Sequence, residues 1–279
     1  MSAPSPFFSD PPRQDCGGSQ KNSSVRIAAF GDVHAGAEMC GRLHEQFAHL
    51  PERADVLLLA GDLTKCGTPD EARVLADELG PLPVPKLAVL GNHDYHADQQ
   101  DKVTAVLEDS GIRVLDGQAE IVELGGQGGQ GGVRLGVAGV KGFGGGFAGA
   151  CGSDFGEPEM KAFVGHTKRL AEQLERRLTD LAEAGVDFRV ALMHYSPIPE
   201  TLQGERLEIY PFLGSYLLAE AVDRAGADLA LHGHAHGGSE KGTTPAGVHV
   251  RNVAQPVIKA PYRVYCLSAA GEPDCEAPS

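Results

Sequence analysis

Five short motifs along the 279-residue chain carry aspartate, asparagine or histidine side chains that could bind metal ions. They read GDVH at 31–34, GDL at 61–63, GNHD at 91–94, MHYSP at 193–197 and GHAH at 233–236. Imidazole, carboxylate and amide oxygen together suit Mn, Fe, Co or Zn, and no thiolate stands among them. Each motif alone is typical of a turn or of a hydrogen-bonded core histidine, but five in order predict a transition-metal site.

Each motif directly follows a short apolar run, so the polar side chains are expected at strand ends. The runs at 25–30, 55–60 and 86–90 have the composition of parallel strands that are buried on both faces. Helical patterns cover 39–49 and 69–79, and the 30-residue spacing from Asp32 to Asp62 and from Asp62 to Asn92 matches successive βαβ units. The motifs should therefore converge at the carboxyl edge of a sheet.

The rest of the chain predicts further strands and helices around two long loops. Helices are expected at 98–110, 158–185 and 215–225, and strands at 112–115, 119–124, 133–140, 187–193, 228–232, 248–253 and 262–267. The glycine-rich segment 125–132 reads as a flexible hairpin loop, and the long loops are 142–157 and 196–214. We expect one domain over 25–267, with a disordered leader at 1–24 and a disordered tail at 268–279.

Composition and charge restrict the partners. Against 24 Lys and Arg residues the chain has 38 Asp and Glu, a formal net charge of −14, which argues against binding to long nucleic acid. A small anionic substrate remains compatible if metal ions supply local positive charge. No apolar run is long enough to span a bilayer, the leader lacks a secretory signal pattern, and the six cysteines are scattered. We expect a cytoplasmic protein with reduced thiols and no membrane partner; its oligomeric state stays open.

The motif set resembles that of the calcineurin-like metallophosphoesterase superfamily, from residue 25 to about 256. The resemblance implies an α/β fold, a four-layer αββα sandwich of two mixed sheets flanked by helices, with two divalent or trivalent transition-metal ions (Mn, Fe, Zn or Co) at the strand ends. By motif position, one ion would be held by Asp32, His34, Asp62 and His236. The other would be held by Asp62, Asn92, His194 and His234. Asp62 would thus bridge the two ions, and His93 and Asp94 would be the catalytic histidine and its orienting partner.

The expected reaction is hydrolysis of a phosphate ester. Two ions about 3.5–4 Å apart would generate a bridging hydroxide, and His93 would protonate the leaving oxygen as general acid. Asp94 would set the tautomer of His93, or it would cap the following helix. The segment GDLTKCGTPDEA resembles the small phosphodiesterase branch that includes cyclic-nucleotide enzymes, so a diester and a small, nucleotide-like phosphorylated substrate are favoured. A phosphomonoesterase and a non-catalytic scaffold are the alternatives.

Several residues near the motifs have two interpretations. His232 is expected to be a packed core histidine rather than a ligand. Tyr195 would either line the pocket or pack beneath its loop. Long loops at the expected rim of the site suggest an aromatic substrate wall formed by Phe143, Phe147, Tyr210 and Phe212.

Overall fold

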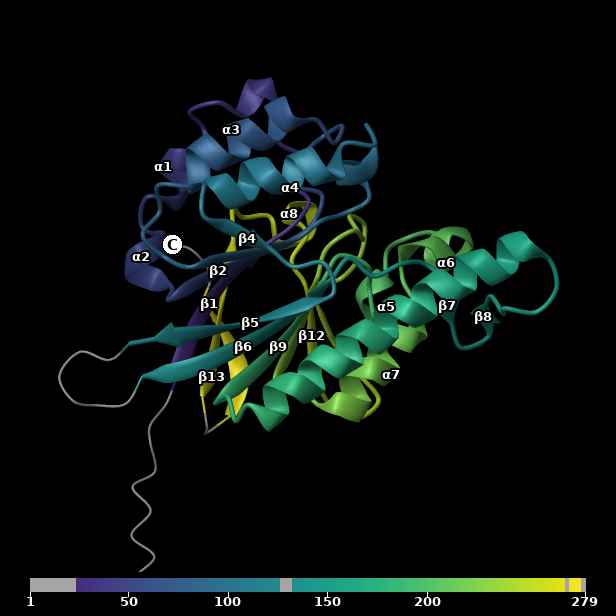
Figure 1. Ribbon diagram of the computed structural model, residues 1–279. Coiled ribbons are helices and arrows are strands. Elements are labelled where there is room, and N and C mark those ends of the chain that lie inside the picture. Colours follow the sequence, from purple (N-terminus) through teal and green to yellow (C-terminus); the bar gives the residue numbers. More distant parts are fainter. Residues whose placement is uncertain (1–23, 126–131, 269–270, 277–279) are drawn as a thin grey trace, which may run out of the picture.

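Two six-stranded sheets lie face to face between two groups of helices (Figure 1). The structure is a computed structural model that describes residues 24–125, 132–268 and 271–276. Three hydrophobic clusters separate the four layers, one on the outer face of each sheet and one between the sheets. This arrangement confirms the predicted αββα sandwich. The glycine-rich segment 126–131 and the leader 1–23 lie outside the described residues.

The first sheet carries the three βαβ units of the N-terminal half. Its strands β1 to β4 are parallel, while β13 pairs antiparallel with β1 and β14 with β13. In sheet order they are β14 (Gly271–Glu276), β13 (Arg263–Ser268), β1 (Ser24–Phe30), β2 (Val56–Ala60), β3 (Lys86–Val89) and β4 (Ile112–Val114).

The second sheet is built from strands between residues 118 and 252. Its four inner strands are parallel, and its two edge strands β11 and β5 are antiparallel to their neighbours. In sheet order they are β11 (Lys241–Thr243), β12 (His249–Asn252), β10 (Leu229–His232), β9 (Phe188–Met193), β6 (Val133–Val140) and β5 (Gln118–Leu124).

Helices cover the outer face of each sheet (Figure 1). Side chains on the first sheet's outer face pack against α1 (Leu43–Phe47), α2 (Leu50–Arg53), α3 (Pro69–Leu79), α4 (Gln100–Asp109) and α8 (Gln255–Ile258). Those on the second pack against α5 (Pro158–Glu183) and α7 (Tyr216–Ala225). Within the described part of the chain, none of the helices is both long and apolar enough to cross a membrane.

The side chains of each strand alternate between the two faces of the sheet, which explains why the central strands are continuous apolar runs. In β1, Ala28 and Phe30 join the cluster under the helices, while Val25, Ile27 and Ala29 join the cluster between the sheets. Successive side chains of a strand point to opposite faces, so a strand with helices on one side and a sheet on the other must be apolar throughout. The same geometry leaves the strand ends as the place for polar side chains.

The structure differs from the sequence-based expectation in three segments. In place of the predicted helix 39–49 the structure has η1 (Ala37–Met39), α1 and α2. Gly41, with a left-handed φ of 76°, separates η1 from α1. The tail expected to be disordered from 268 onward includes β14, which extends the first sheet by pairing with β13. The two long loops contain short elements, namely β7 (Gly146–Phe147), β8 (Ala150–Cys151), η3 (Glu200–Leu202), η4 (Leu207–Ile209) and α6 (Tyr210–Leu213).

Candidate metal centre

The five motifs meet where the carboxyl ends of the two sheets come together. Asp32, Asp62 and Asn92 follow β1, β2 and β3 of the first sheet, and His194 and the pair of histidines in GHAH follow β9 and β10 of the second. A hydrogen bond from the backbone N–H of His234 to the Asp32 carboxylate, 3.0 Å long, links the two sheets at this point. Both sheets thus supply side chains to one cluster.

Four of the cluster residues have a left-handed backbone that non-glycine residues rarely adopt. The φ values are 58° at Asp32, 45° at His34, 51° at Asp62 and 70° at His234. Such conformations cost on the order of 1–3 kcal/mol each and persist where the surroundings impose them. The chain therefore turns sharply after β1, β2 and β10 and directs these side chains into the cluster.

Two glycines allow the backbone to approach the carboxylates. A Cβ atom added to Gly91 would overlap the Asp62 Oδ1 atom, and one added to Gly233 would overlap the Asp32 Oδ2 atom. The glycines of GNHD and GHAH are therefore required because the backbone approaches the carboxylates closely.

One group of possible metal ligands consists of Asp32, His34 and His236. Each offers one donor atom, and these atoms lie within 4.8 Å of one another. His236 Nε2 is 2.9 Å from Asp32 Oδ1. His34 Nε2 is buried and has no hydrogen-bond partner among the residues that the structure describes. A buried nitrogen of this kind normally has a partner, so its position fits a ligand to a cation.

The second group consists of Asp62, His194 and His234, again within 4.8 Å, with Asn92 beside it. His194 Nε2 lies 3.3 Å from Asp62 Oδ1 and 3.0 Å from Asn92 Oδ1. His194 Nδ1 lies 2.8 Å from the carbonyl oxygen of Ala60, which can only accept a hydrogen bond. Nδ1 therefore carries the hydrogen, and Nε2 has the lone pair that a metal ligand needs.

The electrostatics of the cluster favour neutral imidazoles and make Asp32 hard to ionise. Burial lowers the pKa of His34, lowers that of His194 well below its usual value and lowers that of His234 to about 3. Burial also raises the pKa of Asp32 to about 6, while the hydrogen bond to Asp32 raises the pKa of His236. Since metal ligands must be deprotonated, three of the four histidines in the two groups need lose no proton at neutral pH.

His93 faces the same cluster from the first sheet. Its Nε2 atom is 4.0 Å from Asp62 Oδ2, and its ring centroid is 4.4 Å from that of His34. Its backbone N–H donates a 2.8 Å hydrogen bond to Asp62 Oδ1. His93 thus lies beside both the Asp62 carboxylate and the first ligand group.

Asp94 is not the partner of the His93 ring. Its carboxylate accepts hydrogen bonds from the backbone N–H groups of Leu63, Thr64 and Gly91, at 2.8–3.2 Å, and from the Thr64 hydroxyl at 2.6 Å. His93 Nδ1 instead lies 2.9 Å from the carbonyl oxygen of Lys65. The predicted orienting role is therefore wrong, and so is the alternative of a helix cap, since Gln99 precedes α4 in that position. Asp94 ties the GDL and GNHD loops together.

Two residues that the sequence reasoning missed lie at the site. The Lys65 carbonyl sets the tautomer of His93, and a backbone carbonyl leaves no trace in residue identity. Lys141 follows β6 directly, and its carbonyl oxygen accepts hydrogen bonds from the N–H groups of His194 and Tyr195. Burial lowers the pKa of Lys141. Its position directly after a strand was a usable signal, but lysine was not among the metal-ligand residue types on which the five motifs were based.

The remaining candidates divide between core and rim. His232 is buried, as expected, with Nε2 2.8 Å from the Thr201 hydroxyl oxygen. The Tyr195 ring packs 4.4 Å from that of His234. Phe147 is buried with Leu202 and Leu213, which does not fit a substrate wall, whereas Phe212 is 61% exposed and its carbonyl oxygen is 3.3 Å from His234 Nε2.

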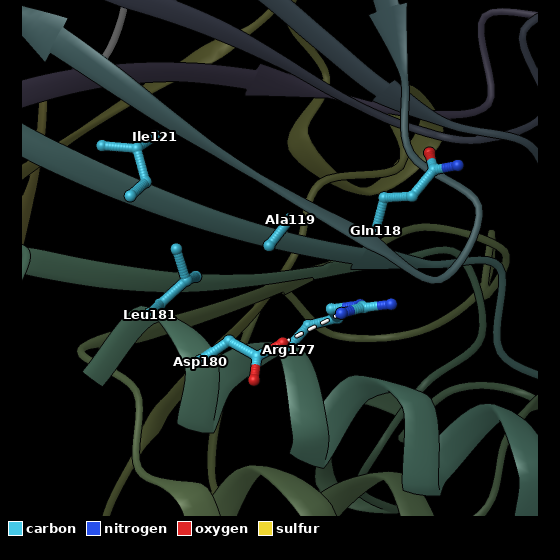
Figure 2. A pocket seen from close by; sticks show the side chains of 6 residues that line it. All are labelled: Gln118, Ala119, Ile121, Arg177, Asp180 and Leu181. Atoms are coloured by element: carbon cyan, nitrogen blue, oxygen red, sulfur yellow. Dashed lines mark hydrogen bonds and ion pairs between the residues drawn. The ribbon is translucent and has the colours of Figure 1, made fainter. Parts of the chain in front are cut away.

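A shallow pocket of about 380 Å³ lies between β5 and α5 (Figure 2). Its charged side chains, Arg177 and Asp180, form an ion pair with a 2.9 Å separation. Its lining includes none of the cluster residues. The pocket therefore adds no chemistry to the site.

The sequence profile described as calcineurin-like phosphoesterase matches residues 25–238. The chain belongs to this family, whose members typically bind divalent metals, and membership suggests a hydrolase. Two curated relatives match shorter segments. The glycerophosphodiester phosphodiesterase GpdQ of Enterobacter lignolyticus is 36% identical over 78 residues, 28% of this chain and 27% of the relative. An uncharacterized metallophosphoesterase of Aquifex aeolicus is 33% identical over 108 residues, 36% of this chain and 39% of the relative.

Solved structures share the fold over most of the chain. TT1561 of Thermus thermophilus has a TM-score of 0.54 at 19% identity, covering 91% of this chain and 99% of that one. The phosphopantetheinyl hydrolase PptH of Mycobacterium tuberculosis has a TM-score of 0.56 at 15% identity, covering 91% and 98%. At these identities the likeness establishes the architecture alone.

Proposed function

We propose that the protein is a dinuclear metal-dependent phosphodiesterase. The observation that carries the proposal is the position of Asp62, which is 3.8 Å from His34 Nε2 on one side and 3.3 Å from His194 Nε2 on the other. A carboxylate between two groups of nitrogen ligands is what a bridging ligand requires. Asp32, His34 and His236 would hold one ion, and Asn92, His194 and His234 the other.

Two divalent ions beside the Asp32 and Asp62 carboxylates would leave a local charge of about +2. When bound, the ions supply Lewis-acid stabilisation of the phosphoryl oxygens and lower the pKa of water. An anionic ester could then bind within a protein of net charge −14. The protein's own contribution is to position the side chains that bind the ions and to protonate the leaving group.

His93 is suited to protonate the leaving oxygen. Its Nδ1 must carry a hydrogen because it faces the Lys65 carbonyl oxygen, so its Nε2 faces the cluster. In the imidazolium form, the N–H bond at Nε2 breaks as the ester P–O bond breaks, and the proton passes to the departing oxygen. The neutral imidazole that remains keeps its hydrogen bond to Lys65.

The preference for a diester rests on similarity. The 78-residue match to a protein named as a glycerophosphodiester phosphodiesterase supports it, as does the GDLTKCGTPDEA segment. We infer a small, nucleotide-like phosphorylated substrate and a cytoplasmic location, in keeping with the composition. Phosphomonoester hydrolysis is the rival activity within the same site.

An activity panel on protein of known metal content tests the proposal. Bis-p-nitrophenyl phosphate, p-nitrophenyl phosphate and cyclic nucleotides would be compared after loading with Mn, Fe, Co or Zn. We expect about two ions per chain and faster turnover of diesters. Protein that binds no metal and hydrolyses none of these esters would contradict the proposal, and faster monoester turnover would overturn the diester preference.

A further inference from the structure

Lys141 places an ammonium group among aromatic rings beside the metal centre. Its Nζ atom lies 5.0 Å from the Tyr95 ring centroid, 4.9 Å from that of Phe143 and 5.3 Å from that of Tyr195. Ring faces attract a cation at these distances. The rings hold the side chain in place while offering it no hydrogen-bond acceptor.

The surroundings of Lys141 connect it to the cluster. Tyr195 follows His194 in the chain, and its ring also packs against His234 with centroids 4.4 Å apart. Tyr95 ends the 3-10 turn η2 (His93–Tyr95) that begins with His93. Two of the three rings that enclose Nζ, those of Tyr95 and Tyr195, therefore adjoin residues of the proposed site, and Tyr195 lies beside the ligand group formed by His194 and His234.

Lys86 shows what a buried structural lysine looks like in the same fold. It is 7% exposed, and its Nζ atom donates hydrogen bonds to the carbonyl oxygens of Leu82 and Val84 at 2.7 and 3.1 Å. Lys141 Nζ makes no hydrogen bond or ion pair with any residue that the structure describes; Asp116 and Asp62 act on it only at longer range. A largely enclosed cation without an acceptor is costly unless a ligand supplies one.

We infer that Lys141 binds an anionic oxygen of the substrate beside the ligand group of His194 and His234. The inference rests on the proposed phosphoesterase function and adds a residue that selects for substrate charge. The oxygen belongs either to the reacting phosphate or to a second anionic group on the substrate. Both present the same chemistry, an anionic oxygen that accepts a charge-assisted hydrogen bond from Nζ.

Footprinting on the wild-type protein tests the inference without relying on turnover. Metal-loaded protein would be treated with an amine-acetylating reagent, with and without inorganic phosphate, and modification read by mass spectrometry. We expect phosphate to slow acetylation of Lys141 by at least about threefold and to leave Lys102, an exposed lysine on α4, unchanged. The same measurement would be made with a phosphate ester that carries a carboxylate. Acetylation rates at Lys141 that neither phosphate nor this ester changes would overturn the inference.

Kinetics of Lys141→Met, Lys141→Arg and the control Lys102→Met provide the second test. Loss of a charge-assisted hydrogen bond should raise KM and the inhibition constant for phosphate about 10- to 100-fold in Lys141→Met, with kcat nearly unchanged. Lys141→Arg should restore most of the affinity, and Lys102→Met should behave as wild type. Values for Lys141→Met equal to those of Lys102→Met would refute a substrate contact.

Two comparisons complete the test. The first shows which group of the substrate supplies the oxygen that Lys141 binds, and the second separates the proposed function from the role of Lys141. If the reacting phosphate supplies it, KM for bis-p-nitrophenyl phosphate rises in Lys141→Met; if a second group supplies it, KM rises only for a p-nitrophenyl diester that carries a carboxylate. Either result supports the inference. Wild-type protein that hydrolyses no ester while phosphate still protects Lys141 would contradict the proposed function alone, and active protein without protection would contradict Lys141 alone.

Discussion

The strand ends that form the metal centre and the two segments at its rim, 142–157 and 196–214, are built in opposite ways. Asp62 is 1% exposed and His194 is fully buried. Asp62 lies in a strained turn with φ of 51°, and His194 contacts Asp62 and Ala60 across the two sheets. On the rim segments, Phe155 is 87% exposed, Leu207 75% and Phe212 61%. The comparison indicates that the centre tolerates few changes, whereas the rim can vary and so adapt to different substrates.

Replacing the bridging carboxylate should have the largest effect. Asp62→Ala removes the carboxylate that lies between His34 and His194, so we expect loss of bound metal and a fall in diester turnover of at least about a thousandfold. Metal analysis and bis-p-nitrophenyl phosphate hydrolysis would measure both. The control Asp109→Ala removes an exposed carboxylate from the end of α4 and should keep both near wild type. Full metal content in Asp62→Ala would rule out the bridging role.

Residues of the two rim segments differ in burial, and replacing Phe147 and Phe212 should show this difference. Phe147 is 5% exposed and packs with Leu202 and Leu213, so Phe147→Ala should lower the free energy of unfolding by about 3–5 kcal/mol. Phe212→Ala should change it by no more than about 0.5 kcal/mol but shift KM for bulky esters roughly three- to tenfold. Denaturant unfolding and a series of esters would measure these changes. Similar unfolding energies in the two variants would contradict the difference in burial.

His93 stands at the boundary between the centre and the rim, with a side chain that is 37% exposed. As a general acid it should contribute about 10²- to 10⁴-fold for esters with poor leaving groups. His93→Ala should therefore slow alkyl esters by that factor and p-nitrophenyl esters far less, because p-nitrophenolate leaves without a proton. The measurement is kcat across leaving groups of increasing pKa. A loss independent of the leaving group would exclude proton donation.

The last effect concerns pH and only the centre. Burial raises the pKa of Asp32 to about 6, so below that pH a cation must displace a proton from its carboxylate. Mn²⁺ affinity should be nearly constant from pH 7 to 8 and should fall by up to about tenfold per pH unit as pH drops below 6. The hydrogen bond to Asp32 raises the pKa of His236. His236 must therefore also lose its proton to bind the ion, which adds to the fall in Mn²⁺ affinity at low pH. Titrations at pH 5, 6, 7 and 8 that gave equal affinities would disprove the proton competition.

The local sequence pattern predicted the structure correctly where an element depends only on its own residues and on those that directly adjoin it. The strands at 25–30, 55–60 and 86–90 appear as β1, β2 and β3 within a residue of the expected ends, because burial on both faces demands a continuous apolar run. The helix at 69–79 was placed correctly because Thr68 and Glu71 form a capping box at its start. The predicted ligand residues converge for the same reason, since each follows a strand.

Expectations failed where neighbours in sequence are not neighbours in space. Asp94 adjoins His93, yet the 3-10 turn η2 directs Asp94 toward Leu63 and Thr64 while His93 faces the cluster. Phe147 sits in a glycine-rich loop that reads as a rim, yet it packs beneath Gly214 of the other segment. In both cases the partner comes from a distant part of the chain, and short-range pattern carries no information about it.

By itself, the sequence determined most of the strands and helices and the residue types available at the end of each strand. Those follow from periodicity, burial and glycine placement, which act over a few residues. Only the tertiary structure decided how the ends from the two sheets meet, that the Lys65 carbonyl faces His93 Nδ1, and that Lys141 is enclosed by three rings. Those contacts join residues from separate strands and loops, so they exist only once the two sheets have packed together.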